Sequence, residues 1–182
     1  MSLGHLVVIY GLDLLIVLLA IGAAATANLE RTLQPFPRRH LLLPGLLAFA
    51  GGLILLVYPD IRDLPVPEVW LVGVAGTLAG AARGARIRLD CDQTDRQVRV
   101  HRGRDAAWAA WTMVLFAIIQ GSLETGLKAN NPYETTAEFL MLLAGGYLLG
   151  RSVVAWVRAR AATHRDLHEA RESRRSGTKR RT

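Results

Sequence analysis

A single carboxylate, Asp13, stands inside the first long apolar run of the sequence, at residues 6–27. A carboxylate in the membrane interior costs roughly 2.5–3.5 kcal/mol to insert, so it normally faces protein or water. Thr77 and Tyr147 fall at similar depths in two later apolar runs, and the three side chains form one polar cluster if those spans adjoin. That cluster would be a proton or substrate site, or Asp13 would only fix helix packing.

Arg151 is the second charged residue that we place well inside an apolar run, residues 136–157. It lies about two turns from the end of that run, so its long side chain can snorkel to the lipid headgroups. A direct ion pair with Asp13 is the alternative, although the helical rise separates the two residues by roughly 9 Å in depth. The sequence leaves both interpretations open.

Small residues recur at four-residue intervals in two of the apolar runs. Gly76, Gly80 and Gly84 form one series, and Gly146 and Gly150 form another. This spacing lets helix backbones approach closely. It predicts either helix packing within one bundle or a contact between two copies of the chain.

His164 and His168 lie four residues apart on a predicted tail helix, with Asp166 and Glu169 beside them. One helix face could then offer two imidazoles to a metal, but two ligands do not complete a site, and a solvated helix face is the simpler interpretation. Cys91 is the one cysteine, which excludes an intrachain disulfide, and we expect it to be a small apolar residue. No motif identifies a catalytic residue, a metal site or a cofactor, and enzymatic activity is disfavoured.

Five apolar runs carry or flank these residues, and hydrophobic residues make up 51% of the chain. Each run reaches or approaches the roughly 20 residues needed to cross a bilayer. We expect spans at about residues 6–27, 41–58, 66–82, 106–123 and 136–157. The predicted fold class is an all-α integral membrane protein, with a five-helix transmembrane bundle over residues 1–160 and a basic, partly disordered tail over residues 161–182. The first run has no preceding basic residue, which favours an uncleaved span over a signal peptide.

The segment at residues 86–101 has a different pattern, because apolar and polar residues alternate on both sides of a polar turn at residues 92–95. The apolar positions are Ile87, Leu89, Cys91, Val98 and Val100. Alternation on both sides of a turn predicts a small cytoplasmic β-hairpin. We expect its apolar face to lie on the membrane or on the helix ends.

The distribution of arginine and lysine predicts the orientation of the spans. One side receives three arginines in the first connection, seven between residues 83 and 104, and nine basic residues after Val157, whereas the other receives only Arg62 and Lys128. Short cytoplasmic loops carry the basic excess, so the N-terminus is predicted outside and the C-terminus in the cytoplasm. The net charge of +7 then indicates anionic lipid headgroups as partners rather than nucleic acid.

The order of these features resembles the CcdC family of small multi-pass bacterial membrane proteins, which are encoded near cytochrome c maturation genes. The resemblance includes Leu-Leu-Leu-Pro at residues 41–44 after a proline- and arginine-containing loop, a second span closing at Tyr58-Pro59, and a glycine-rich third span before the alternating segment. A last span containing Arg151 completes it, up to about His168, and the tail here is longer. The resemblance implies a bacterial plasma (inner) membrane protein with an accessory role in cytochrome biogenesis, and it supplies no catalytic residues.

Three functional hypotheses follow. The leading one is a non-enzymatic accessory or interaction component, whose hairpin and tail contact a membrane protein or a second copy. The alternative is a small oligomeric transporter or proton-coupled channel that uses Asp13. The third is a lipid-modifying enzyme, for which only His5, His40 and His101 offer catalytic groups, with His5 on the opposite face from the other two.

Overall fold

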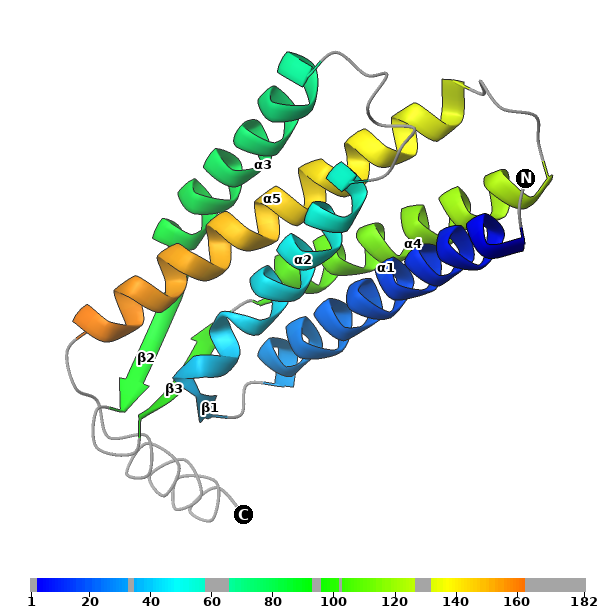
Figure 1. Ribbon diagram of the computed structural model, residues 1–182. Helices are drawn as coiled ribbons and strands as arrows, with labels where there is room; N and C mark the ends of the chain where they lie inside the picture. The colour runs from blue at the N-terminus through cyan, green and yellow to red at the C-terminus, as the bar shows by residue number, and fades with distance from the viewer. Residues whose placement is uncertain are drawn as a thin grey trace, which may run out of the picture.

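The computed structural model describes residues 3–32, 35–57, 66–92, 96–101, 103–126 and 132–162. Within these ranges the chain forms five α-helices (Figure 1): α1 (Leu3–Leu29), α2 (Leu43–Val57), α3 (Val66–Arg86), α4 (Arg104–Gly126) and α5 (Pro132–Ala161). The five apolar runs therefore correspond to five helices. Of the predicted tail, only residues 161 and 162 are described, and His164 and His168 lie outside the described residues.

Helix α5 occupies the centre of the bundle, where it contacts α2, α3 and α4, while α1 packs against α2 and α4. Helices α1, α2, α5 and α4 thus form a four-helix ring, and α3 lies on the outer side of α5 (Figure 1). The predicted cluster of Asp13, Thr77 and Tyr147 required the first, third and fifth spans to adjoin. In the structure α3 and α5 do adjoin, but the main neighbours of α1 are α2 and α4.

Glycine determines how closely α3 approaches α5. A Cβ atom added at Gly76, Gly80 or Gly150 would collide with the backbone carbonyl of Leu143, Tyr147 or Thr77, respectively. At Gly84 it would lie 2.7 Å from the carbonyl oxygen of Arg151, and at Gly146 2.6 Å from that of Gly73. All five predicted packing glycines therefore lie in this internal interface, where only a hydrogen side chain leaves room for the facing backbone.

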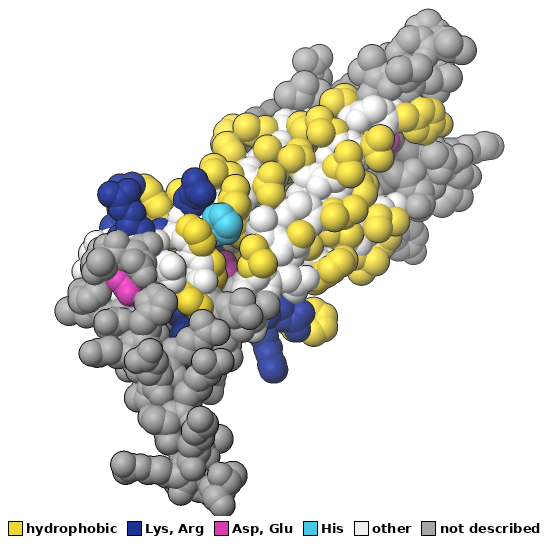
Figure 2. Space-filling model, turned by 90° about the horizontal axis from the view of Figure 1, so that it is seen from below, with side chains coloured by type: hydrophobic (Ala, Val, Ile, Leu, Met, Phe, Trp, Pro, Cys, Tyr) yellow, Lys and Arg dark blue, Asp and Glu magenta, His cyan; other side chains and the backbone are white. Residues whose placement is uncertain are grey.

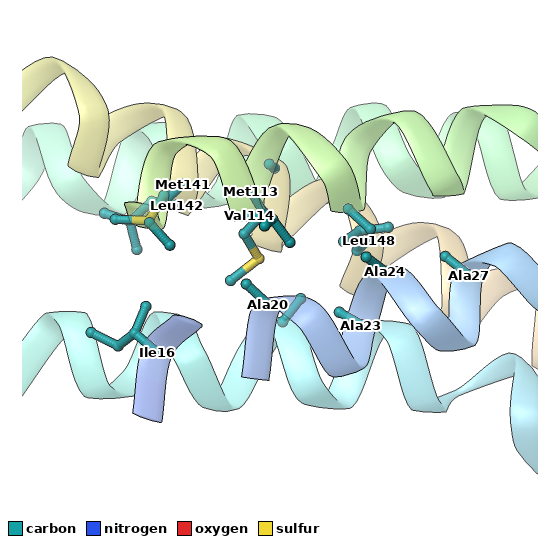
Figure 3. Packing of buried hydrophobic residues seen from close by; sticks show 14 of the residues in the cluster. Ile16, Ala20, Ala23, Ala24, Ala27, Met113, Val114, Met141, Leu142 and Leu148 are labelled. Carbon is teal, nitrogen blue, oxygen red and sulfur yellow. The ribbon is translucent and has the colours of Figure 1, made fainter. Parts of the chain in front are cut away.

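The core of the ring is built mainly from alanine and a few larger apolar side chains. Figure 3 shows Ala20, Ala23, Ala24 and Ala27 of α1 facing side chains of α4 and α5, among them Met113 and Leu148. Small residues at helix interfaces are typical of membrane bundles, where close backbone approach replaces the hydrophobic driving force.

Large apolar side chains point outward instead. Every helix has exposed examples, including Leu14 and Leu18 on α1, Leu46 on α2, Leu71 on α3, Leu115 on α4 and Val157 on α5. Hydrophobic side chains cover the middle of the bundle, and the arginine side chains drawn in dark blue lie toward one end (Figure 2). Among the described residues, three segments are long and apolar enough to cross a membrane: Tyr10–Leu29, Arg38–Leu55 and Thr136–Ala161.

A small antiparallel sheet closes one end of the bundle, with strand order β1-β3-β2. Strands β2 (Arg88–Asp92) and β3 (Gln97–His101) form the predicted hairpin, with Leu89 opposite Val100 and Cys91 opposite Val98. Strand β1 (Phe36–Pro37) comes from the connection between α1 and α2 and was not predicted. It pairs with β3 so that Phe36 lies opposite Val98, which joins two connections that are distant in sequence.

The apolar face of the sheet covers the helix ends, as one of the two predicted alternatives had it. Its side chains form a second small core with the 3₁₀ turn Arg38–Leu41 and the last turns of α5. That core contains Phe36, Leu41, Ile87, Cys91, Val98, Val100 and Ala159. Arg158 ties α5 to the start of the hairpin, because its Nη1 donates to the carbonyls of Gly84 (2.9 Å) and Ile87 (2.8 Å).

Candidate functional site

Arg151 is buried inside the bundle, with only 1% of its surface exposed. Its Nη1 and Nη2 donate to the two carboxylate oxygens of Glu30, at 3.2 and 2.7 Å. Its Nε donates to Oδ2 of Asp105 at 3.1 Å. The planar guanidinium suits this forked arrangement. The predicted snorkelling of Arg151 is therefore wrong, and its carboxylate partners are Glu30 and Asp105 rather than Asp13.

Asp105, on α4, links this ion pair to α3 and to a second side chain of α5. Its Oδ2 also accepts hydrogen bonds from Nε of Arg83 on α3 (2.9 Å) and from the hydroxyl of Tyr147 on α5 (3.1 Å). The hydroxyl of Thr77 donates to the carbonyl of Gly73 within its own helix. Both hydroxyls of the predicted Asp13–Thr77–Tyr147 cluster thus have other partners. The polar cluster that the structure does form joins Glu30, Arg83, Asp105, Tyr147 and Arg151, and we call it the inner network.

Local structure explains how these side chains meet. Glu30 begins the 3₁₀ turn Glu30–Thr32 directly after α1, and Gly103 precedes α4. A Cβ atom at Gly103 would lie 2.7 Å from Cβ of Glu30, so a larger residue would push the two chain segments apart. Asp105 stands in the first turn of α4, where the helix dipole favours a negative charge.

The pKa values of the two carboxylates shift in opposite directions. Burial raises the pKa of Glu30 above its ordinary value, and the opposing Arg151 charge does not cancel that effect. Burial also acts to raise the pKa of Asp105, but the charge of Arg151 and the hydrogen bonds from Arg83 and Arg151 outweigh it, so the pKa is lowered. Asp105 is therefore the more firmly ionised of the two. Its Oδ1 is buried and accepts no hydrogen bond within the described structure.

The inner network forms part of the wall of a cavity of about 970 Å³ at the sheet end of the bundle. The cavity is basic, because five arginines line it against the two carboxylates Glu30 and Asp105. The arginines are Arg31, Arg83, Arg86, Arg88 and Arg104. His101 also lines it, and its Nε2 lies 2.8 Å from Oδ2 of Asp90. We refer to this site as the basic cavity. This excess of positive charge favours anions over cations as ligands.

A second buried polar pair lies at the other end of the bundle. Nε2 of Gln120 on α4 donates to Oε1 of Glu138 on α5 at 3.3 Å, and both side chains are buried. Helices α1 and α4 are neighbours whose sheet-side ends meet at Glu30 and Gly103. Asp13 lies as many residues before Glu30 as Gln120 lies after Gly103. The helical rise therefore places Asp13 level with Gln120, roughly 25 Å from Glu30. Asp13 thus belongs to the end of the bundle away from the inner network.

An apolar groove of about 170 Å³ runs between α2 and α3, with α5 as its floor. Phe49, Leu53, Trp70 and Val74 form its sides, and Gly145 and Gly146 lie on the floor. It exists because α3 packs on α5 and leaves a gap beside α2. Within the described ranges, no three His, Cys, Asp or Glu side chains are grouped so as to hold a metal ion.

Sequence reasoning missed Glu30, Asp105 and Arg83, although each had a visible signal. All three are charged residues within three positions of an apolar run, where a side chain can turn inward as easily as toward water. Comparison of the chain with models of protein families, with curated proteins and with solved structures finds no match.

Proposed function

We propose that this chain is a five-span integral membrane protein that acts as a non-enzymatic interaction component at the cytoplasmic face of a bacterial plasma membrane. The observation that carries the proposal is the distribution of side chains. All five helices expose some of their large apolar residues, while the interior holds alanine, glycine, a few larger apolar side chains and the ionised network. A bundle in water would bury the large apolar residues, whereas a bundle in lipid gains nothing from doing so.

Helices α3 and α4 support five spans rather than three. Helix α3 contains no charged residue between positions 69 and 82, and α4 contains none between positions 106 and 123. Both expose large apolar side chains, with Leu71 at 70% and Trp108 at 70%. Trp70 and Trp108 each lie within two turns of the start of their helix, the level at which tryptophan is enriched at membrane interfaces.

The sheet end supports the predicted orientation. It carries Arg38, Arg86, Arg88, Arg104 and Arg158 together with the hairpin. The positive-inside rule then assigns this end to the cytoplasm and the N-terminus to the outside. Arg62 and Lys128, the two basic residues assigned to the outer side, lie outside the described residues.

The interaction role rests on the basic cavity and the sheet, which present a charged surface at the membrane boundary. The partners we propose are anionic lipid headgroups and a membrane protein or second copy. The resemblance to the CcdC family adds cytochrome c biogenesis as the process, and this link stays a prediction.

The alternative function, a proton-coupled transporter or channel, is favoured by one observation. Gln120 and the carboxylate of Glu138 are buried together, and Asp13 is level with them. In a transporter, Asp13→Asn would abolish complementation of a deletion strain and pH-gradient-driven flux in proteoliposomes. In an interaction component, Asp13→Asn complements fully, whereas disruption of the hairpin does not.

Cysteine labelling tests the membrane topology. In a Cys91→Ala background, Arg96→Cys places a thiol beside the hairpin turn, and Glu68→Cys places one at the exposed start of α3. A membrane-impermeant maleimide should label Glu68→Cys in intact cells and Arg96→Cys only after the membrane is opened. Labelling of both variants, or of Arg96→Cys alone, in intact cells would overturn the orientation. Release of the protein from membranes by carbonate would overturn the proposal as a whole.

A further inference from the structure

We propose that the basic cavity is a binding site for a phosphate ester, held by Arg86, Arg88 and Arg104. The inference rests on the proposed function only for the position of the cavity at the cytoplasmic surface of the membrane. It adds the ligand class and the residues that recognise it.

The five arginines that line the cavity differ in the partners of their guanidinium groups. Arg31 donates to Asn28, and Arg83 is held by Asp105. Arg86, Arg88 and Arg104 line the same cavity, and no carboxylate in the described part of the chain forms an ion pair with them. Guanidinium groups bind phosphate oxygens through two parallel hydrogen bonds, which is stronger and more directional than a contact to water. Three such arginines around one cavity therefore favour a phosphate group.

Glu30 and Asp105 belong to the wall of the cavity, and their carboxylates would repel an anion if no cation compensated their charge. Arg151 lies behind them and holds both, with 1% of its own side chain exposed. The buried guanidinium cancels much of their field, so the arginines at the rim set the potential in the cavity. Helix α4 begins at Arg104 on the same wall, and the positive end of its dipole adds to that potential.

The size and the position of the basic cavity also suit a phosphate ester. About 970 Å³ is the volume of a site for a whole small molecule rather than for a bare ion. Trp108, 70% exposed, lies one turn beyond Arg104 on the outer face of α4. The cavity thus lies next to the apolar surface of the bundle. Both a phospholipid headgroup of the inner leaflet and a soluble phosphate ester can reach such a site, and they share the chemistry that the arginines recognise.

The test compares the intact protein with two double variants of equal net charge. Arg86→Gln/Arg88→Gln removes two arginines from the cavity. Arg39→Gln/Arg160→Gln removes two exposed arginines from the same end of the bundle, and neither lines the cavity. Native mass spectrometry after extraction from nanodiscs of phosphatidylcholine and phosphatidylglycerol measures retained anionic lipid. Calorimetric titration of glycerol phosphate into the protein in phosphatidylcholine nanodiscs measures the soluble source.

We expect the cavity variant to bind about a hundredfold more weakly, roughly tenfold for each arginine whose charge-assisted hydrogen bonds are removed, and the control to bind like the intact protein. A loss of lipid retention alone assigns the ligand to the bilayer, and a loss of glycerol phosphate binding assigns it to solution. Equal weakening in both variants, or no binding by the intact protein in either experiment, would overturn the proposal. Because both experiments use protein already integrated in a bilayer, such a failure would leave the five-span membrane protein in place. A melting temperature shared by the two variants would show that both are folded.

Discussion

Arg151 and Glu30 lie 121 positions apart in the sequence and form a forked ion pair in which each side chain is only 1% exposed. Such a pair joins the end of α1 to the middle of α5, and Asp105 extends it to α4. A charge pair in the interior is not by itself evidence of a large stabilising contribution, because both charges lose their hydration. Breaking one is costly, however, because the partner remains buried without compensation.

Arg151→Gln should destabilise the protein by about 3–5 kcal/mol, since two carboxylates then lose their buried counter-charge. Unfolding in mixed micelles with increasing dodecyl sulfate, followed by circular dichroism, measures the change. Arg160→Gln is the matched control. Its guanidinium lies 3.6 Å from the centre of the Trp156 ring at an exposed position, so the destabilisation should stay near 1 kcal/mol or below.

A compensating variant separates the effect of charge balance from that of packing. Glu30→Gln/Asp105→Asn/Arg151→Gln leaves no buried charge without a partner, because Arg83, which loses Asp105, is 45% exposed and can be hydrated. The triple variant should therefore be more stable than Arg151→Gln alone. A triple variant as unstable as the single one would show that shape, rather than charge, makes Arg151 necessary.

Two glycines of α3 should respond with opposite signs to the same substitution. Gly80→Ala places a methyl group on the carbonyl of Tyr147, and overpacking of this kind costs about 1–3 kcal/mol. The methyl group of Gly73→Ala meets no atom within 4 Å. This substitution should therefore stabilise the fold by roughly 0.5–1 kcal/mol, because alanine favours the helix over glycine by that amount. Melting temperatures in detergent measure both changes. Equal effects at the two positions would contradict the close α3–α5 contact.

Asp105 should make the protein sensitive to acid. Its pKa is lowered in the folded chain from an ordinary value of 3.8, so the stabilisation is present above pH 3.8 and is lost as pH falls through the lowered value. Glu30 acts in the opposite direction, because its raised pKa makes protonation favour the folded state. The difference between intact protein and Asp105→Asn therefore isolates the aspartate. That difference in melting temperature should be smaller at pH 3 than at pH 6, with the loss at the acidic end of this range. A constant difference would show that Asp105 does not cause the sensitivity to acid.

Cys91 should be unreactive in the folded protein. Its side chain is 1% exposed in the second small core, and burial raises the pKa of the thiol, which keeps the thiolate scarce. Maleimide should label it only after denaturation in dodecyl sulfate, while Arg96→Cys in the Cys91→Ala background is labelled in native detergent extracts. Fast labelling of Cys91 in the native extract would show that the hairpin leaves the helix ends.

Much of the architecture could be predicted from local pattern. Long apolar runs produced the five helices, because the number of residues between charged segments matches a helix that crosses a bilayer. The alternation around residues 92–95 predicted the hairpin, because successive side chains of a strand face opposite sides of the sheet. Strand β1 has two residues, too few to show alternation, and it went undetected.

The partners of the charged residues could not be predicted in this way. Whether Arg151 meets Asp13 or Glu30 depends on which helices are neighbours and on which side of α5 the arginine lies. The glycine series indicated a close helix contact, yet it did not say that α3 would pack on α5 and stand outside the ring. Those outcomes depend on packing among all five helices, which hydrophobicity and charge along one chain do not encode.

The pairing of Phe36 with Val98 also bears on synthesis. The first strand leaves the ribosome about sixty residues before its partner, a delay of several seconds at about 5–20 residues per second. During that interval α2 and α3 are synthesised, because both lie between the two strands in the chain. The three-stranded sheet can therefore form only after the third helix has been synthesised.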